Sequence, residues 1–538
     1  MRRRRYRQIT WRLMLSVISA TLGASFQFGF STGFVNNMEM FLLHYFQTQG
    51  IVPSDALPQD DAFRFWWSLA VSAFAFGGML GTCVFPALAD RIGRKETILS
   101  TSIFSYLACY FMAFPRSWFD LILGRVLVGI GAGGACGAVP SYVTEIAPNE
   151  LRGTLGTVHQ LMITLGILVS QTLLTSKLHL LGNDQLWHYS LLVPASCTTF
   201  LLFTLPFCAD SPPFLLRTKG EEAAKEALSW FRPGDYQTKR RMYRELRHMY
   251  HEMELADRAT LWEVFSDELL WKPMLVGIVV NLSMQFSGID AVFFYSTSVF
   301  LSAGIGLQNA QFCTTLIGLC NVLVTIPAMM FMDLFGRKTI QSCGLGGMCV
   351  SYVIMTVGLV FNLHFVSVTA MLMIICFFAL GPGCIAWFII AELVPMHARC
   401  IAISMALGVN WCASWFISFI FPHLLAYLKK WTFATFAAST FVLACYTHVF
   451  LPETKGKTVL EVRETFYTPS TKTNSPALHS LGEPLFPEPM PTLVNLLAEG
   501  DVPIVQSTNE VASSMSHTLV HRLREVEDIP LELDGAML

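Results

Sequence analysis

The feature that most constrains this chain is a series of apolar stretches, each long enough to cross a bilayer. A helix needs about 20 apolar residues to span the hydrocarbon core, and in lipid its backbone polar groups must be paired within the helix. Twelve such stretches occur, at roughly 13–35, 66–89, 97–114, 120–142, 155–175, 187–208, 273–301, 311–332, 340–361, 366–391, 399–421 and 430–451. The pattern predicts an all-α polytopic membrane protein with twelve transmembrane helices.

The composition excludes a soluble protein of several domains. Of the 538 residues, 53% are hydrophobic and only 14% are charged, whereas globular chains carry about 25% charged residues. So few charges cannot cover a soluble surface of this size, so membrane lipids are the predicted surroundings. The net charge of -2 and the lack of a basic domain predict no nucleic-acid partner.

Basic residues mark one side of the membrane in the predicted topology. Cytosolic loops carry an excess of Lys and Arg, so the basic segments and both termini are expected on the cytosolic side. The basic residues are Arg2, Arg3, Arg4, Arg5, Arg7 and Arg12 at the start, Arg91, Arg94, Lys95, Arg337 and Lys338 in short loops, and a cluster within 239–247.

The polar segments divide the chain into four parts. Residues 1–208 form a first six-helix half and residues 273–466 a second. The stretch 209–272 is too polar to span and predicts a cytosolic linker with short helices. The tail 467–538 has eight prolines and three basic against ten acidic residues, a composition typical of disorder. We expect any contacts with cytosolic partners to fall on this tail.

Three features recur between the halves at nearly one offset. DRIGRK at 90–95 returns as DLFGRK at 333–338, and Asp210 returns as Glu453, both 243 residues later. A Glu/Arg pair recurs at an offset of 247 residues, as Glu145 and Arg152, then Glu392 and Arg399. The shared spacing predicts two halves related by a parallel repeat, an arrangement in which substrate binds near the midplane between them.

The charged residues of these motifs are interpreted as salt bridges at the cytosolic ends of the spans. Opposed carboxylates and guanidiniums can form bidentate pairs that hold helix ends together and separate when that side opens. A purely topogenic role for the charges is the alternative. The predicted gating residues are Asp90, Arg91, Arg94, Arg125, Glu145, Arg152, Asp333, Arg337, Glu392 and Arg399.

At these residues the chain resembles the sugar porters of the major facilitator superfamily, most closely the facilitative glucose transporters of animals, from about residue 10 to 466. The shared motifs, in order, are Gln27-Phe28-Gly29, ADRIGRK (89–95), Gly124-Arg125, 145–153, His159-Gln160-Leu161, Ser287-Gly288-Ile289, FFYSTS (293–298), Gly381-Pro382-Gly383, Trp387, Glu392, Asn410-Trp411 and PETKGK (452–457). The resemblance implies the major facilitator fold and transport of a hexose by alternating access.

The substrate site needs polar, uncharged side chains at mid-membrane depth, because a hexose is a ring of hydroxyls with an apolar face. Amides can donate and accept, and indoles offer flat apolar surfaces. Packing of amides between helices is the rival interpretation. The residues that match the family's sugar site, with Asp290 at an amide position, are Gln27, Gln160, Gln285, Asp290, Asn321, Trp387, Asn410 and Trp411.

Two departures from the family bear on energy coupling. Ser31 occupies the place where proton-coupled sugar porters have an aspartate, so the usual proton acceptor is absent. This favours a uniporter for glucose, fructose or both. Asp290 is an intramembrane carboxylate, and such groups are functional by default, so a proton-coupled symporter is the alternative.

Breaks at Gly288 and Gly381-Pro382-Gly383 should interrupt two spans.

The same sequence features are compatible with functions other than hexose transport. A carrier of polyol, urate or dehydroascorbate would use the same fold, and a non-transporting sugar sensor would signal through the tail. No nucleophile–base pair, phosphate-binding loop or Cys/His metal spacing occurs in the sequence. We therefore predict that the protein is not an enzyme and uses no cofactor or metal. The resemblance implies the plasma membrane as its location.

Overall fold

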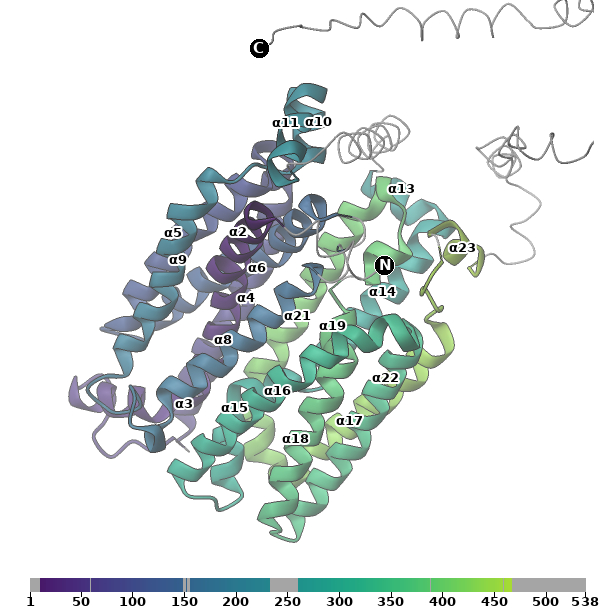
Figure 1. Cartoon of the computed structure of the whole chain (residues 1–538). Coiled ribbons are helices and arrows are strands. Elements are labelled where there is room, and N and C mark those ends of the chain that lie inside the picture. The colour runs from purple at the N-terminus through teal and green to yellow at the C-terminus, as the bar shows by residue number, and fades with distance from the viewer. Residues whose placement is uncertain are drawn as a thin grey trace, which may run out of the picture. The chain divides into compact units, whose positions relative to one another are not determined.

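The computed structural model describes residues 10–58, 60–148, 151, 155–232, 260–387, 389–457 and 459–466, all within one compact unit (Met1–Tyr467). The described residues form helices joined by short connections, and they contain no β-strand. The predicted linker beyond Arg232 and the predicted disordered tail lie largely or wholly outside these ranges. Figure 1 shows the helices of the first half, in purple and blue, beside those of the second half, in green and yellow.

The first half contains six spans. A continuous helical segment is made of α2 (Trp11–Ala20), a π-helical turn η1 (Thr21–Ser25) and α3 (Phe26–Thr48). It is followed by α4 (Asp61–Ile92), α5 (Arg94–Ala113), α6 (Trp118–Ile146), α8 (Val158–Leu174) and a last span built from η3 (Trp187–Leu191), α9 (Leu192–Thr204) and η4 (Leu205–Phe207). The short helix η2 (Ser176–Leu178) precedes that last span.

Short helices follow the first half, and a second set of six spans comes after them. The short helices are α10 (Pro212–Lys219), α11 (Glu221–Phe231) and α13 (Leu261–Ser266). The spans are formed by α14 (Glu268–Phe286) with α15 (Ile289–Ser302), α16 (Leu307–Phe335), α17 (Arg337–Val360), α18 (His364–Leu380) with α19 (Pro382–Ile385) and α20 (Ile389–Leu393), α21 (Met396–Leu428), and α22 (Thr432–Phe450) after η5 (Lys429–Trp431). A short helix, α23 (Val459–Glu464), closes the described part.

These helices account for the twelve predicted spans. Within the described ranges, nine segments are long and apolar enough to cross a membrane, and one of them, Ile401–Phe450, contains both α21 and α22. The span at α8 is a shorter apolar helix of 17 residues. The remaining span, α5, is a helix of 20 residues that begins with charged side chains. The prediction of a twelve-helix membrane protein is therefore confirmed.

Both predicted breaks interrupt helices. The span formed by α14 and α15 changes direction at Gly288, whose φ of 78° is costly for a residue with a Cβ. A Cβ at this position would also lie 2.6 Å from the Phe436 ring. The second break is at Gly381, where α18 ends and Pro382 begins α19. Both breaks lie beside the central cavity described below.

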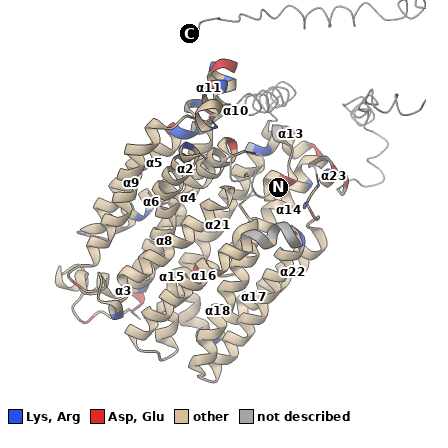
Figure 2. Ribbon diagram, viewed as in Figure 1, with Lys and Arg blue, Asp and Glu red and all other residues tan. Residues whose placement is uncertain are grey.

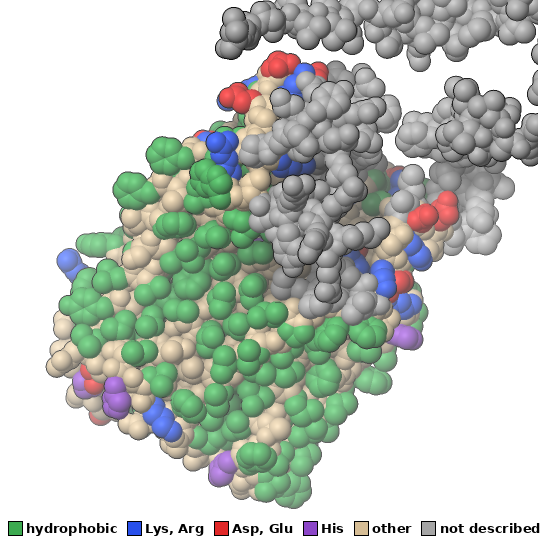
Figure 3. Space-filling view, in the orientation of Figure 1, with side chains coloured by type: hydrophobic (Ala, Val, Ile, Leu, Met, Phe, Trp, Pro, Cys, Tyr) green, Lys and Arg blue, Asp and Glu red, His purple; other side chains and the backbone are tan. Residues whose placement is uncertain are grey.

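The surface has the polarity expected of a protein surrounded by lipid. Large apolar side chains are exposed along the flanks of the bundle, as Figure 3 shows on one face. Charged side chains gather at one end, near α5, α10, α11 and α23 (Figure 2). This end contains Arg94, Lys95, Arg337 and Lys338, and we refer to it as the basic end. The apolar flanks and the span lengths identify an integral membrane protein.

The two halves meet through three pairs of long helices, α4 with α21, α8 with α16, and α3 with α15, and through the short helix η2 with α16. At the first pair, a Cβ on Gly78 of α4 would lie 2.5 Å from the Trp411 ring of α21. Glycine at this position thus allows an indole ring to lie directly against the neighbouring helix. The contacts between the halves enclose the cavity described next.

Candidate functional site

A narrow cavity lies between the halves, and the space around its lining, including the part open to solvent, is about 560 Å³. Nine helical or loop segments from both halves contribute to its lining, so neither half forms it alone. The lining residues are Phe28, Thr32, Phe74, Gln160, Ile163, Ile167, Met284, Gln285, Ile289, Asp290, Phe293, Phe294, Asn321, Phe378, Trp387, Asn410, Trp411 and Ser414. Seven of the eight predicted substrate-binding residues are among them.

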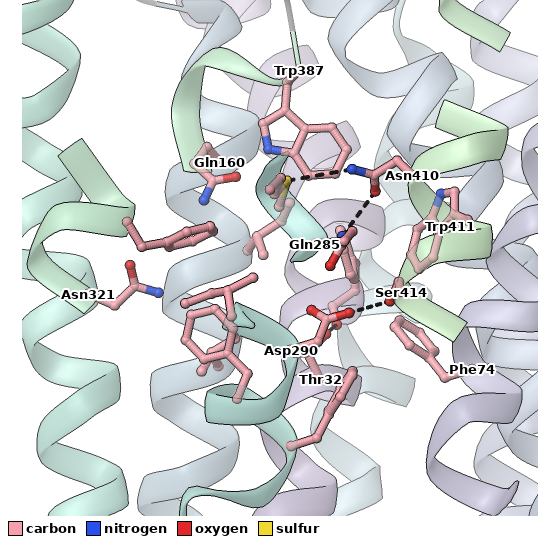
Figure 4. A pocket seen from close by; sticks show the side chains of 18 residues that line it. Thr32, Phe74, Gln160, Gln285, Asp290, Asn321, Trp387, Asn410, Trp411 and Ser414 are labelled. Atoms are coloured by element: carbon pink, nitrogen blue, oxygen red, sulfur yellow. Dashed lines mark hydrogen bonds between the residues drawn. The ribbon is translucent and has the colours of Figure 1, made fainter. Parts of the chain in front are cut away.

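A short hydrogen-bond network holds two of the lining amides in place (Figure 4). The Nε2 of Gln285 donates to the Oδ1 of Asn410 over 3.1 Å. The Nδ2 of Asn410 in turn donates to the carbonyl oxygen of Asn281 over 3.0 Å. These bonds join α14 to α21 and leave the acceptor of the Gln285 side chain, its Oε1, without a protein partner among the described residues.

Several polar atoms of the lining are buried and have no hydrogen-bond partner among the described residues. They include acceptors and donors: Oε1 of Gln160 and Gln285, Oδ1 and Nδ2 of Asn321, and Nε1 of Trp387 and Trp411. Buried polar atoms are nearly always paired, and an unpaired one costs about 1–3 kcal/mol. A ligand with several hydroxyl groups would satisfy both kinds of atom, because a hydroxyl donates and accepts.

Aromatic rings form the apolar part of the cavity. Phe28 of α3 lies with its ring centroid 5.4 Å from that of Trp411 and 6.3 Å from that of Trp387. Phe74 of α4 contacts Trp411 from another side, with 5.6 Å between centroids. Rings from the first half therefore pack against rings from the second, and a ligand between them would meet flat apolar surfaces.

Asp290 supplies the single carboxylate of the lining. It lies in the first turn of α15, is 8% exposed, and accepts a hydrogen bond from the hydroxyl of Ser414 on α21. No Lys or Arg lines this cavity. Asp290 thus faces the cavity as an acceptor without a cationic partner in the lining.

The structure places the remaining predicted residue, Gln27, outside the cavity. Its Nε2 donates to the carbonyl of Pro194 and to the hydroxyl of Thr198, so the side chain joins α3 to α9 within the first half. The next residue, Phe28, points into the cavity instead. A step of one residue turns a helix by about 100°, which separates the two side chains. The assignment of Gln27 to the substrate site is wrong in this structure.

Sequence analysis missed several lining residues that helical periodicity could have found. Ser414 follows Asn410 by one turn of α21, and Thr32 follows Phe28 by one turn of α3, so each lies on the same helix face as its partner. The phenylalanines of the lining could not be recognised from the sequence in this way, because apolar residues occur throughout every span.

At the basic end, a cluster of charges joins helix ends within the first half. The guanidinium Nε of Arg94 lies 3.1 Å from a carboxylate oxygen of Glu145, and its Nη1 lies 3.4 Å from Asp90. Asp210 accepts from the backbone N–H of Lys95 over 3.1 Å and so caps α5. Burial raises the pKa of Asp210, and the bonds from backbone N–H groups partly offset this.

The second half repeats this cluster almost atom for atom. Arg337 lies 3.0 Å from Glu392, and Glu453 accepts from the backbone N–H of Arg337 over 2.8 Å and of Lys338 over 3.2 Å. Thr454 donates to Glu392, as Ser211 donates to Glu145 in the first half. The repeat read from the sequence is therefore present in three dimensions, down to the caps of α5 and α17.

The other predicted gating residues are placed differently. Arg91 is exposed and has no ion-pair partner in the described part of the chain. Arg399 lies in the first turn of α21 and is partly buried. Asp333 lies in α16, but its side chain is outside the described part, and so is the whole of Arg152. The ion pairs described above, of Arg94 with Glu145 and Asp90 and of Arg337 with Glu392, connect helix ends within one half.

Arg125 does not belong to the basic end at all. It lies in the second turn of α6, at the opposite end of that helix from Glu145, and is 1% exposed. Its guanidinium donates to the carbonyls of Ser31 over 2.8 Å and Val71 over 3.3 Å, and lies 4.8 Å from the Phe74 ring centroid. Its prediction as a cytosolic gating residue is corrected: Arg125 supports Phe74, a wall of the cavity.

A network of polar side chains joins the two halves at the end opposite the basic end. Asn36 of α3 donates to the Phe293 carbonyl over 2.8 Å and to the Ser296 hydroxyl over 2.7 Å, and accepts from the Thr297 N–H over 3.0 Å. One turn of helix further, Glu39 accepts from the hydroxyl of Ser298 over 2.5 Å. Sequence analysis did not identify this network.

A second pair of helices contributes to the same contact between the halves. The hydroxyls of Thr175, just after α8, and Thr315 of α16 lie 2.6 Å apart, and the Ser176 N–H donates to Gln311 over 3.1 Å. We refer to the contacts of Asn36, Asn37, Glu39, Thr175 and Ser176 with the second half as the inter-half network. It joins the two halves at that end of the protein.

Comparison with known proteins agrees with this architecture. The profile of the "Sugar (and other) transporter" family matches residues 16–466. The facilitated glucose transporter member 3 of Rattus norvegicus is 35% identical over 473 residues, covering 85% of this chain and 94% of the relative. The human member 3 is 34% identical over 471 residues (85% and 93%), and the member 1 of Gallus gallus is 33% identical over 496 residues (88% and 98%).

Solved structures of similar fold come from the major facilitator superfamily. The partially occluded inward-open structure of the xylose transporter XylE from E. coli has a TM-score of 0.70 at 21% identity, covering 84% of this chain and all of that one. The proton:xylose symporter XylE bound to a bromodeoxyglucose gives 0.70 at 22% identity, over 85% and 99%. The fold is thus the major facilitator fold, and the family match over most of its length shows that this chain belongs to the sugar transporter family.

Proposed function

We propose that the protein is a facilitative carrier, a uniporter, for hexose sugars such as glucose and fructose. The observation that carries the proposal is the central cavity, where unpartnered amide and indole groups face a space walled by aromatic rings. Hydroxyls of a sugar match the polar atoms, and its C–H face matches the rings. The relatives named above as facilitated glucose transporters support the same substrate class.

Alternating access follows from the placement of the cavity between two repeated halves. In this structure the inter-half network joins the two halves at the end opposite the basic end. Transport requires a second state in which this network is broken and the basic end is closed around the bound sugar. We propose that the basic end faces the cytosol, as the distribution of Lys and Arg indicates, and that the plasma membrane is the site of action.

The substrate classes in competition differ in charge and in hydroxyl pattern. Urate carries a negative charge at neutral pH and would meet the Asp290 carboxylate, so the lining disfavours it. Acyclic polyols lack the ring face that the tryptophans would cover. Uptake of D-glucose, D-fructose and urate into sealed proteoliposomes separates these classes. Saturable uptake of a hexose without accumulation supports the proposal, and selective uptake of urate or of a polyol contradicts it.

A proton-coupled symporter is the second candidate, and one observation favours it. That observation is Asp290, a buried carboxylate in the lining, because a carboxylate within the membrane can carry a proton. Ser31 argues against a symporter, because it occupies the position where the resemblance to proton-coupled sugar porters would place an aspartate. The Ser31 carbonyl is instead bound by Arg125. Uptake measured with and without an inside-alkaline pH gradient decides between the two, because only a symporter would concentrate the sugar. No step of either mechanism requires catalysis, a cofactor or a metal.

A further inference from the structure

Two thiols contact each other on adjacent helices of the second half, away from the cavity surface. The Sγ of Cys320 on α16 and the Sγ of Cys376 on α18 lie 3.3 Å apart. Both side chains are partly buried. The sulfurs of a disulfide are about 2.05 Å apart, so a movement of about 1.3 Å would bring these two to bonding distance. Among the free cysteines that the structure describes, this is the pair for which a thiol–thiol contact is found.

The pair lies at the edge of a surface that faces lipid. Leu319 and Leu323, next to Cys320 on α16, are 41% and 61% exposed. Cys320 is 13 residues after the start of α16, or about 20 Å along the helix, which is near the middle of the hydrocarbon core. A reagent that reaches these thiols therefore has to be soluble in the bilayer, and thiol-based reductants in water reach them slowly.

We propose that Cys320 and Cys376 are an oxidation site that forms a reversible disulfide with apolar hydroperoxides, such as those of oxidised lipid. One thiol sulfur attacks the terminal peroxide oxygen and the O–O bond breaks. The thiol proton passes to the leaving oxygen, which departs as an alcohol, and a sulfenic acid remains on the cysteine. The second sulfur attacks the sulfenic sulfur, forms the S–S bond and releases water. Two thiols and one hydroperoxide thus give one disulfide, one alcohol and one water, and the two thiol protons end on the alcohol and the water.

The consequence for transport follows from the residues next to the pair. Asn321 directly follows Cys320 and lines the cavity, and so does Phe378, two residues after Cys376. The α18 helix ends at Leu380, four residues after Cys376, where the chain breaks at Gly381. A disulfide would fasten α18 to α16 just before this break. If the segment after Gly381 has to move during the transport cycle that we propose, the bond would slow the cycle.

The chemistry is tested first on the full-length protein in proteoliposomes exposed to cumene hydroperoxide. Mass spectrometry of a non-reduced digest should find the peptides of Cys320 and Cys376 joined, and reduction with a membrane-permeant thiol should separate them. The control Cys313→Ala, on the same helix, should behave as the wild type. If the two peptides stay unlinked while other cysteines are oxidised, the proposal is wrong, whatever the transport activity.

The effect on transport is tested on the same vesicles. Oxidation should lower the initial rate of hexose exchange at least about threefold, because a slowed conformational step limits turnover. The loss should be absent in Cys320→Ser and in Cys376→Ala, two variants with different replacements, and should be reversed by reduction. An equal loss in these variants would overturn the proposed link to transport. Since the joined peptides are measured without any sugar, failure of the proposed hexose transport would be recognised separately.

Discussion

At the scale of single residues, the polar side chains within apolar spans predicted most of the polar lining of the cavity. The direction in which each side chain leaves its helix explains the residues that were assigned wrongly. Gln160, Gln285 and Asn321 were predicted because amides can donate to and accept from sugar hydroxyls, and because these positions match the family's sugar site. Gln27 satisfied the same criterion, but its partners are on α9. Sequence position alone does not say toward which neighbour a side chain points, so one of the amides was assigned to the wrong surface.

The placement of Arg125 shows a second limit of the same kind. Arg125 and Glu145 belong to one helix, but they are about 20 residues and therefore about 30 Å apart. Arg125 belongs to a motif, Gly124-Arg125, that carries an arginine like the motifs at the basic end. It was therefore grouped with the ion pairs of that end. The direction of α6, which begins with Trp118 at the other end, excludes this grouping.

Asp290 offers the sharpest test at this scale. An ionised carboxylate only accepts hydrogen bonds, whereas an amide also donates. We expect Asp290→Asn to remain active and to change the relative rates for glucose and fructose by about ten- to hundredfold, since one misplaced polar partner costs about 1–3 kcal/mol. Competition uptake with surface expression as the control measures this.

Two other results for the same variant would have different meanings. Loss of accumulation with retained exchange would show that Asp290 carries a proton. Poor expression with unchanged preference would show that its bond to Ser414 is structural, and Ser414→Ala should then have the same effect.

Arg125 should prove to be a structural residue that also affects substrate affinity. Lysine keeps the charge but cannot reach the carbonyls of Ser31 and Val71 together or lie flat against Phe74. We expect Arg125→Lys to lower the free energy of unfolding by about 1–3 kcal/mol, because a buried acceptor loses its donor. Thermal unfolding in detergent measures this loss.

The same variant should also raise the KM for hexose, because Phe74 lines the cavity. The exposed Arg91→Lys is the matched control and should leave both quantities unchanged. If Arg125→Lys has normal stability but changes the balance between inward-facing and outward-facing states, the assignment of Arg125 as a gating residue would be restored.

At the scale of elements, glycine and proline residues predicted where two spans are interrupted. The sequence repeat predicted that α5 and α17 are capped in the same way. Gly288 and Gly381 interrupt their spans where expected. Asp210 and Glu453, recognised by their common offset, cap α5 and α17 in the same way. The turn η1 in the first span was not predicted, because a π-helical turn has no distinct composition.

The ion pairs at the basic end should stabilise each half rather than hold the two halves together. Glu392→Gln keeps an acceptor for Thr454 but removes the charge that faces Arg337. A partly buried pair contributes more than the roughly 0–1 kcal/mol of an exposed one, so the variant should unfold at a lower temperature. The difference should shrink as salt is added.

Glu145→Gln should have the same effect in the first half, because the two clusters are copies. The control is Glu222→Gln, whose carboxylate is 88% exposed in its pair with Lys225 and should not affect stability. If Glu392→Gln leaves stability unchanged but shifts the balance between inward and outward states, the pair acts across the halves after all.

At the scale of the whole molecule, the sequence predicted two halves but not the contacts between them. A sequence repeat identifies residues that occupy equivalent positions in the two halves. The inter-half network is made by residues that are not equivalent, such as Asn36 with Phe293 and Ser296. Polar residues near the end of a span also resemble ordinary loop-flanking residues. Only the three-dimensional arrangement shows that they bind the other half.

The inter-half network should determine which state of the transporter is populated. Asn36→Ala removes bonds to three backbone groups and one hydroxyl of α15. If it costs the closed state about 1–3 kcal/mol, the population open at that end should rise by about five- to a hundredfold. Hydrogen exchange should then increase at the end of α3 and in α15 around Ser296, without a matching loss of global stability.

The control Gln47→Ala lies on the same helix, and its side chain binds only the carbonyls of Ser54 and Ala56 in the first half. It should leave exchange in α15 unchanged. Glu39→Gln should act in the same direction as Asn36→Ala but more weakly, because an amide can still accept from Ser298. If Asn36→Ala unfolds the whole protein or leaves α15 protected, closure depends on the aromatic contacts around Phe28 and Trp411 instead, and Phe28→Ala should then open the same end.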